Sequence, residues 1–272
     1  MSKHITSFNT YADYSASTLT PPNVSVIKNS LEIIYKDVEV GNTFGDVLMY
    51  DVANDKLVST YNALWNTDLY PISSFMPIAV NVYPKSMTND GNSRWLAIRW
   101  ADNESDGGSS TNKYLAWGSN SLNTSFDKNA LNGRENTDIA LQAADGTTAN
   151  TPSACASFAA CNRFVTSGTS QGDWYLPSFG ELSIYISSWD NMDKITKQMN
   201  KIKAADSSIV TDVLPYQSGD YMVYTLQTST VYDATSILCV EIVNGGQNYN
   251  NKGKESTTTS WGGVGVHPML SF

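Results

Sequence analysis

The residue types that most often carry out acid–base or nucleophilic chemistry are scarce in this sequence. Only two histidines occur, His4 and His267, and His267 stands beside a proline in a strand-like segment. A catalytic site needs several titratable groups that converge on one place, and neither histidine has an evident set of partners. We therefore expect no catalytic residues and no enzymatic activity.

The cysteines do not suggest a covalent framework either. Their number is odd, and the chain begins without a recognisable signal peptide, which favours free thiols over disulfides. In a helix, Cys155 and Cys161 would lie about 240° apart around the axis, so we do not expect them to pair. Cys239 stands alone in a strand-like segment. Three free thiols are the expectation.

A loop between residues 102 and 113 carries the most metal-like pattern in the chain. Asp102, Glu104 and Asp106 resemble an alternating set of acidic calcium ligands. The spacing after them departs from the EF-hand pattern, which places further oxygen ligands at fixed positions. We therefore expect no metal and no other cofactor.

A polar and aromatic run near the C-terminus has the composition of a recognition surface. Tyr249 and Trp261 offer flat apolar faces, and asparagines between them offer paired hydrogen-bond donors and acceptors, a mixture that suits sugar rings. The run lacks histidine and cysteine, so it is better suited to recognition than to acid–base work. We predict a turn-and-loop ligand face made by Gln247, Asn248, Tyr249, Asn250, Asn251 and Trp261. The alternative is an ordinary solvated loop.

Charge and composition exclude several classes of partner. The net charge is −9 and basic residues form no run, which argues against nucleic acid as a partner. No stretch of about 20 apolar residues exists, so no membrane insertion is expected. The chain has no apolar signal core at its start, which predicts synthesis in a cytosol. Its loops, rich in Asn, Ser and Thr, are nevertheless typical of an exterior protein. A virion component, made inside a host cell and later exposed on the outer surface of the particle, fits both observations.

Strand-like segments flank a helical middle. Apolar runs and alternations predict strands at 46–50, 76–83, 94–100, 221–226, 236–243 and 264–270. Strands, then helices, then strands indicate an α+β fold with an antiparallel sheet that both ends of the domain join. We expect the first and last strands of the domain to be adjacent in this sheet.

Two helical segments are expected in that middle part. The first covers residues 153–165. The second begins at Ser178, which forms a capping box with Glu181, and continues with apolar residues at three- and four-residue steps. We expect a break inside this second segment, with Ser188 or Asp190 capping a new helix.

The first 38 residues differ from the rest. A short helical stripe is followed by a pair of prolines, and strand-like pieces at 24–27 and 31–35 suggest a hairpin. So small a segment cannot build its own core and needs a partner surface. We predict a docking or oligomerisation segment over residues 1–38 and one domain over residues 39–272.

The segment 172–182, GDWYLPSFGEL, resembles the "GDWYLPS-x-GEL" signature of a C-type-lectin-like family common in gut Bacteroidales and their phages. That family belongs to a group that includes formylglycine-generating-enzyme-like domains and the variable proteins of diversity-generating retroelements. The resemblance implies a C-type-lectin-like fold with mainly antiparallel sheets, in which Trp174, Tyr175 and Leu182 pack a helix against a sheet. Formylglycine-generating enzymes use a cysteine pair near the C-terminal end, and the cysteines here do not match it.

Other stretches agree with this family in the expected order. They resemble its opening strand, its "LAVAL" strand, its tryptophan segment, its "DGKANT" helix entry and its "VRPVLAF" ending, and they are residues 45–50, 94–98, 115–118, 132–137 and 266–272. The resemblance covers roughly residues 41–272. One departure is the segment 223–229, which differs from the family's usual "YWSS", so the contour on the ligand side is expected to differ.

Two pieces of the first 38 residues, 8–14 and 22–27, resemble a segment that often precedes such domains in Bacteroides phage structural proteins. The resemblance implies a phage virion structural protein, either a head fibre, a capsid decoration or a tail fibre, that displays its lectin-like domain for adhesion to the host surface or its glycans. Its expected partners are other virion proteins through residues 1–38, further copies of itself in a trimer, and a host glycan. The alternatives are a purely architectural capsid protein without a ligand and a bacterial surface adhesin.

Overall fold

The computed structural model describes residues 43–60, 65–101, 115–119, 122–143, 155–208, 223–243, 246–254, 258–259 and 262–272. The predicted docking segment, residues 1–38, and the acidic loop with Asp102, Glu104 and Asp106 lie outside the described residues. Within the described ranges, no helix combines the length and apolar character needed to cross a membrane. These ranges form a mixed α+β protein with mainly antiparallel sheets and four α-helices, which confirms the predicted fold class.

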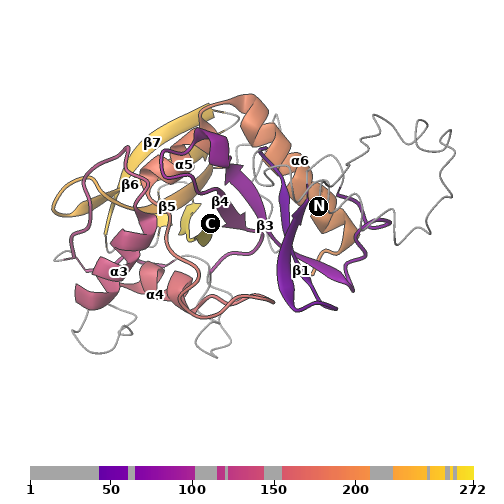
Figure 1. Ribbon diagram of the computed structural model, residues 1–272. Coiled ribbons are helices and arrows are strands. Elements are labelled where there is room, and N and C mark those ends of the chain that lie inside the picture. The colour runs from indigo at the N-terminus through magenta and orange to yellow at the C-terminus, as the bar shows by residue number, and fades with distance from the viewer. Residues whose placement is uncertain are drawn as a thin grey trace, which may run out of the picture. The chain divides into compact units, whose positions relative to one another are not determined.

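The first sheet contains the strands that come early in the chain together with the last one. Its order is β10-β4-β3-β1-β2, and every neighbouring pair is antiparallel. The strands are β1 (Val47–Asp51), β2 (Lys56–Thr60), β3 (Phe75–Tyr83), β4 (Arg94–Ala97) and β10 (Met269–Ser271). β1 and β3, drawn in indigo and purple, lie side by side in Figure 1.

The last strand joins the same sheet as the first, as the sequence predicted, but the two are not neighbours. β3 runs back along β1, and the other edge of β3 pairs with β4, where Val80 faces Leu96. The remaining edge of β4 then accepts the short β10, with Met269 opposite Leu96. An expectation of direct pairing between the first and last strands was therefore wrong, because β3 and β4 lie between them.

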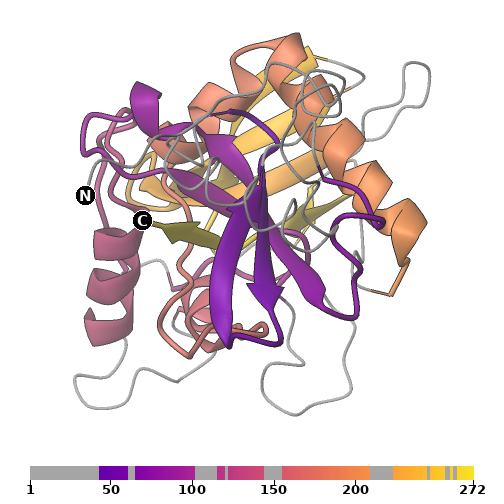
Figure 2. The same ribbon diagram turned by 45° about the vertical axis from the view of Figure 1, so that its right-hand side comes forward.

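The second sheet is built from the C-terminal part of the chain. Its order is β7-β6-β5-β9-β8, with a parallel pair between β5 and β9 and antiparallel pairs elsewhere. Its strands are β5 (Val223–Val231), β6 (Ser236–Val243), β7 (Gly246–Gly253), β8 (Thr258–Thr259) and β9 (Gly262–Gly265). Figure 2 shows the indigo strands of the first sheet in front of the orange and yellow strands of the second.

The predicted closing strand at 264–270 is divided between the two sheets. Its first part belongs to β9 in the second sheet, and its last part belongs to β10 in the first. Pro268, which lacks a backbone donor, stands in the connection. Two backbone hydrogen bonds guide the crossing: Ala101 donates to the carbonyl of Val266 (3.0 Å), and Ala97 donates to that of Pro268 (3.0 Å).

Three of the four helices in the described ranges fall in the two segments that local signals predict, and the other begins at the helix entry, residues 132–137, that the resemblance implies. They are α3 (Gly133–Ala143), α4 (Ala156–Arg163), α5 (Phe179–Ile186) and α6 (Trp189–Ala205). Ser178 caps α5, and the predicted break falls at Ser187 and Ser188, where the Ser188 side chain accepts from the backbone N–H of Asn191 (3.2 Å). α4 is shorter than the predicted helix at 153–165, and Cys155 is its N-cap residue.

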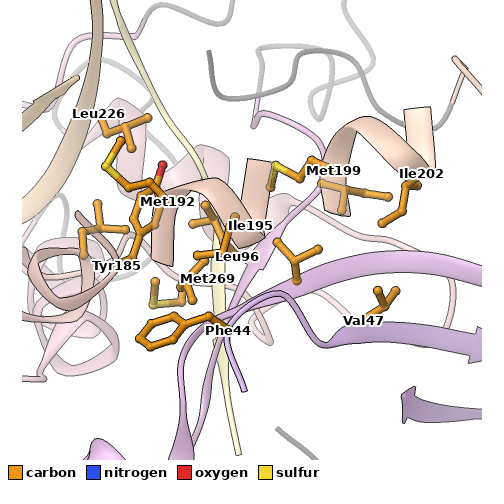
Figure 3. Packing of buried hydrophobic residues seen from close by; sticks show 14 of the residues in the cluster. Phe44, Val47, Leu96, Tyr185, Met192, Ile195, Met199, Ile202, Leu226 and Met269 are labelled. Atoms are coloured by element: carbon orange, nitrogen blue, oxygen red, sulfur yellow. The ribbon is translucent and has the colours of Figure 1, made fainter. Parts of the chain in front are cut away.

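A large hydrophobic cluster fills the space between α6 and the first sheet. Along α6, Met192, Ile195, Met199 and Ile202 recur at the spacing of one helix face, and all are buried. Figure 3 shows these side chains above Leu96 and Val47 of the sheet. Burial of each such side chain contributes about 1.5–3 kcal/mol, so this face fixes α6 on β3.

The opposite face of the first sheet is buried as well. Val47 and Met49 point into the first cluster, whereas Leu48 between them belongs to a second cluster with Trp95 and Trp174. This is why β3 and β4 read as nearly continuous apolar runs rather than as strict alternations. The helix α5 contacts β3, β5 and β6, so it connects the two sheets.

Candidate functional site

The signature segment 172–182 forms a turn, a short bridge and the start of α5. Gly172 has a φ of 92°, a conformation that favours glycine. Trp174 is fully buried, meets Phe164 edge-on with ring centroids 5.1 Å apart, and donates to Thr169 Oγ1 (3.0 Å). The backbones of Tyr175 and Met269 exchange two hydrogen bonds of 3.0 Å. The segment therefore ties the last strand to α5.

The predicted core and capping roles in this segment are confirmed. Trp174, Tyr175 and Leu182 are all buried. The backbone N–H of Ser178 donates to Glu181 Oε2 (2.8 Å), and that of Glu181 donates to Ser178 Oγ (3.3 Å), which is a complete capping box. Ser178 Oγ also donates to the carbonyl of Ala130 (2.7 Å), which fixes the chain just before α3.

Glu181 also binds two buried side chains through the carboxylate oxygen that takes no part in the capping box. Its Oε1 accepts from Arg94 Nε (2.7 Å) and from the Tyr175 hydroxyl (2.9 Å). Arg94 and Glu181 are 2% and 1% exposed, so this is a buried ion pair. Arg94 Nη2 also donates to Asp90 Oδ2 (2.6 Å), and Nη1 donates to the carbonyl of Asn92 (3.0 Å). A charge buried this deeply is tolerated because each of its donors has an acceptor.

The protonation states of this network follow from its charges. Burial alone lowers the pKa of the Arg94 guanidinium, but Tyr175, Asp90 and Glu181 together raise it above its ordinary value. Burial, and then the charge of Glu181, raise the pKa of Tyr175 well above its usual range. Burial raises the pKa of Asp90, but its hydrogen bonds with Arg94 and with the backbone of Asn92 outweigh this effect, so the net shift of the pKa is downward. Arg94 is thus charged, Tyr175 is neutral and Asp90 is ionised near neutral pH.

A polar cavity of about 380 Å³ opens above this network. Its floor contains the buried side chains of Arg94, Tyr175 and Glu181. Its rim comes mainly from α3 and the residue before it: Asn132, Glu135 and Asp138, which follow one another at three-residue steps along one side of the helix. We call this cavity, with its floor and rim, the α3 pocket.

The guanidinium of Arg134 completes the wall of the α3 pocket. It lies over the ring of Tyr175, 4.8 Å from the centroid. Its Nη1 donates to the carbonyl of Gly172 (2.8 Å), and its Nη2 donates to that of Asp173. The start of α3 also approaches the floor closely, because a Cβ on Gly133 would lie 2.3 Å from Glu181 Oε2. The wall and the floor are therefore one rigid unit.

Four of the stretches that resemble the lectin-like family meet at the α3 pocket. They contribute Arg94, Arg134, Tyr175 with Glu181, and Ser271. In the sequence each of these stretches carries its own separate signal, and nothing in them indicates a pocket between them. The available signal was an arginine in an apolar strand, which requires a buried carboxylate partner.

The predicted ligand face has a different structure from the one expected. Residues 247–251 lie within β7, and not in a loop, because each of them pairs with a residue of β6, from Gln247 opposite Ile242 to Asn251 opposite Leu238. β7 is the edge strand of the second sheet in the described part of the chain. The structure thus places five of the six residues on one strand, and Trp261 lies outside the described residues.

The histidine and cysteines of the domain are buried. His267 is 1% exposed and stacks on Trp100 with ring centroids 4.7 Å apart. Cys155, Cys161 and Cys239 are free and buried, which confirms the predicted free thiols. Burial raises the pKa of Cys161 and of Cys239 far above the ordinary value, so both thiols stay protonated. Among the described residues, no group of three or more His, Cys, Asp or Glu side chains is arranged to hold a metal ion.

The class defined by these observations is an α+β domain with two five-stranded sheets, a buried ionic network and a polar pocket above it. The chain matches no protein-family model, no curated protein and no solved structure.

Proposed function

We propose that the chain is a non-enzymatic structural and binding protein on the outer surface of a bacteriophage particle, as a head fibre, a capsid decoration or a tail fibre. The observation that carries this proposal is the use of the signature segment as a scaffold. Its polar residues Tyr175, Ser178 and Glu181 are committed to hydrogen bonds that hold α5 and the neighbouring strands together. A domain whose buried polar groups serve rigidity is suited to the display of a recognition surface.

The proposed fold within this class is C-type-lectin-like. Three features support it: the first and last strands share a sheet, the segment GDWYLPSFGEL forms a turn followed by a capped helix, and that helix packs on strands of both sheets. These features agree with the resemblance of residues 41–272 to the lectin-like family.

The state of the nucleophilic and basic groups supports a non-enzymatic role. Catalytic thiols and imidazoles work at sites that a substrate can reach, and a reactive cysteine has a lowered pKa. Cys161 and Cys239 have raised pKa values, and His267 is buried against Trp100.

The proposed activity is adhesion to a host surface or its glycans. The ligand face predicted from sequence, residues 247–251 with Trp261, remains part of this proposal, now with residues 247–251 on the edge strand β7. A single lectin-like site of about millimolar affinity is weak. Many copies on one particle raise the avidity by about 10²–10⁴, so weak sites are sufficient for a virion protein.

Particle incorporation tests the virion part of this proposal. We expect mass spectrometry of purified particles to detect the chain, and immunogold electron microscopy to locate it on their outer surface. A variant without residues 1–38 is expected to stay soluble and to melt cooperatively, but to be absent from particles. Normal incorporation of this variant would contradict the docking role, and absence of the full chain from particles would contradict the virion assignment.

Particle binding tests the adhesion part. We expect particles that carry Tyr249→Ala and Trp261→Ala to bind host polysaccharide much more weakly than wild-type particles, with a melting temperature close to wild type. Unchanged binding with an unchanged melting temperature would favour a purely architectural capsid protein. A large fall in melting temperature would show that these aromatic residues belong to the core.

A further inference from the structure

We propose that the α3 pocket binds a sugar unit that carries no negative charge, either a neutral or an amine-bearing sugar. The inference rests on the proposed adhesive function and adds a second ligand surface to it, apart from the β7 run. A cavity of about 380 Å³ lies in the range typical of small-molecule sites.

The floor of the α3 pocket is rigid before any ligand arrives. Arg94, Tyr175 and Glu181 are at most 2% exposed, and each is held by hydrogen bonds of 2.7–2.9 Å within the network. A ligand that enters the pocket therefore meets fixed walls, and little conformational entropy is lost in ordering the protein.

The rim, in contrast, carries polar groups that the fold leaves uncommitted. Glu135 and Asp138 are exposed, and among the described residues neither carboxylate takes part in a hydrogen bond or an ion pair. They lie three residues apart on α3 and face the same cavity, with Asn132 one step before them. Two neighbouring carboxylates without partners in the fold are suited to accept hydrogen bonds from adjacent hydroxyl groups of a sugar ring. Asn132 Oδ1 already accepts from Asn136 Nδ2 (3.2 Å), so it lines the rim as a fixed polar group.

The charges of the pocket decide which sugars fit. Four carboxylates, those of Asp90, Glu135, Asp138 and Glu181, line it together with two guanidinium groups, which leaves a surplus of negative charge. Neither guanidinium is available for an anion. Arg94 is occupied by Glu181 and Asp90, and Arg134 by two backbone carbonyls and the Tyr175 ring. An acidic sugar would meet repulsion without a compensating cation, whereas a neutral or amine-bearing sugar would not.

Binding measurements on intact particles test this assignment. The probes are neutral hexose oligosaccharides, glucosamine oligosaccharides with free amines, and uronic-acid oligosaccharides, immobilised at equal density. We expect wild-type particles to bind the neutral or the amine-bearing class and to bind uronic acids least. The double variant Glu135→Ala/Asp138→Ala is expected to lose about tenfold or more in binding, with an unchanged melting temperature, because both side chains are exposed.

A matched control and a charge-reversal variant sharpen the test. Asp68→Ala removes an exposed carboxylate that does not line the pocket, and it is expected to bind like wild type. Glu135→Lys/Asp138→Lys is expected to shift the preference towards uronic acids. If wild-type particles bind sugars but the Ala variant binds equally well, or if uronic acids bind best, the pocket assignment is overturned while the adhesive function stands. If wild-type particles bind none of the three classes, the pocket assignment is overturned together with the glycan-binding part of the adhesive function.

Discussion

Arg94 and Lys254 are two buried cations of this domain that the fold accommodates in different ways. Arg94 lies in the first sheet and is compensated by carboxylates, those of Glu181 and Asp90. Lys254 follows β7 and donates to neutral oxygens, the carbonyl of Leu122 and Asn123 Oδ1 (3.0 Å), with its Nζ 5.5 Å from the centroid of the Trp117 ring.

The difference appears in the two pKa shifts. The pKa of Arg94 is raised, because its acidic neighbours outweigh its burial. The pKa of Lys254 is lowered, because its burial outweighs the attraction of Asp233. The Arg94 site therefore stabilises a permanent charge, whereas burial at the Lys254 site disfavours the charged form of the lysine. The Arg94 site is also the one that forms the floor of a pocket.

The largest effect is expected when the charge of Glu181 is removed. Glu181→Gln keeps the shape of the side chain but leaves Arg94 buried without its main partner, which costs about 3–5 kcal/mol in the free energy of unfolding. Chemical denaturation measures this loss. Glu135→Gln, on the exposed rim, is the matched control and is expected to change stability by less than about 0.5 kcal/mol. A loss below about 1 kcal/mol for Glu181→Gln would remove the distinction between the two cations.

A smaller effect is expected at Lys254. Lys254→Met retains the aliphatic stem but leaves the carbonyl of Leu122 without this donor, which costs about 1–3 kcal/mol near neutral pH. Because the pKa of Lys254 is lowered on folding, the folded state holds this proton less tightly than the unfolded state. The free energy of unfolding of the wild type, minus that of Lys254→Met, should therefore increase with pH. The increase should fall between the lowered pKa of Lys254 and its ordinary value of 10.5. Denaturation across the alkaline range checks this, and a falling difference would contradict the comparison.

The smallest effect is expected at Asp90, whose side chain is 38% exposed. Because its pKa is lowered on folding, Asp90 stabilises the folded state above its ordinary pKa of 3.8, and this contribution is lost as the pH falls through the lowered value. Solvent screens the pair, so Asp90→Asn should cost about 0.5–1 kcal/mol at neutral pH. The difference between the two proteins should vanish in acid. A difference that persists well below the lowered pKa would show that Asp90 acts through something other than its charge.

The parts of the fold that depend on neighbouring residues could be predicted from the sequence. The capping box of Ser178 and Glu181 and the recapping at Ser188 each involve residues only three positions apart, so their signals are local. The main strands were also predictable, because the hydrophobic clusters on the two faces of the first sheet require nearly continuous apolar runs in its strands. β2 was missed because Lys56–Thr60 is short and has one fully apolar buried side chain, Val58. The available signal was the turn-forming pair before it, Asn54 and Asp55, and Asp55 has a φ of 48° in the structure.

The parts that join distant residues could not be predicted. Arg94 and Glu181 are 87 positions apart, and nothing local in either segment identifies the other as its partner. The α3 pocket was missed for the same reason. The run 247–251 was interpreted as a loop because its asparagines are poor strand formers. Pairing with the apolar β6 overrides that preference.

A double-mutant cycle between Arg94 and Glu181 tests whether the signature segment is the scaffold of the α3 pocket. Arg94→Met, Glu181→Gln and the double variant would be compared with wild type by chemical denaturation. We expect the double variant to be more stable than the sum of the two single losses implies, with a coupling energy of about 2 kcal/mol or more. A coupling below about 0.5 kcal/mol, as for independent sites, would contradict it.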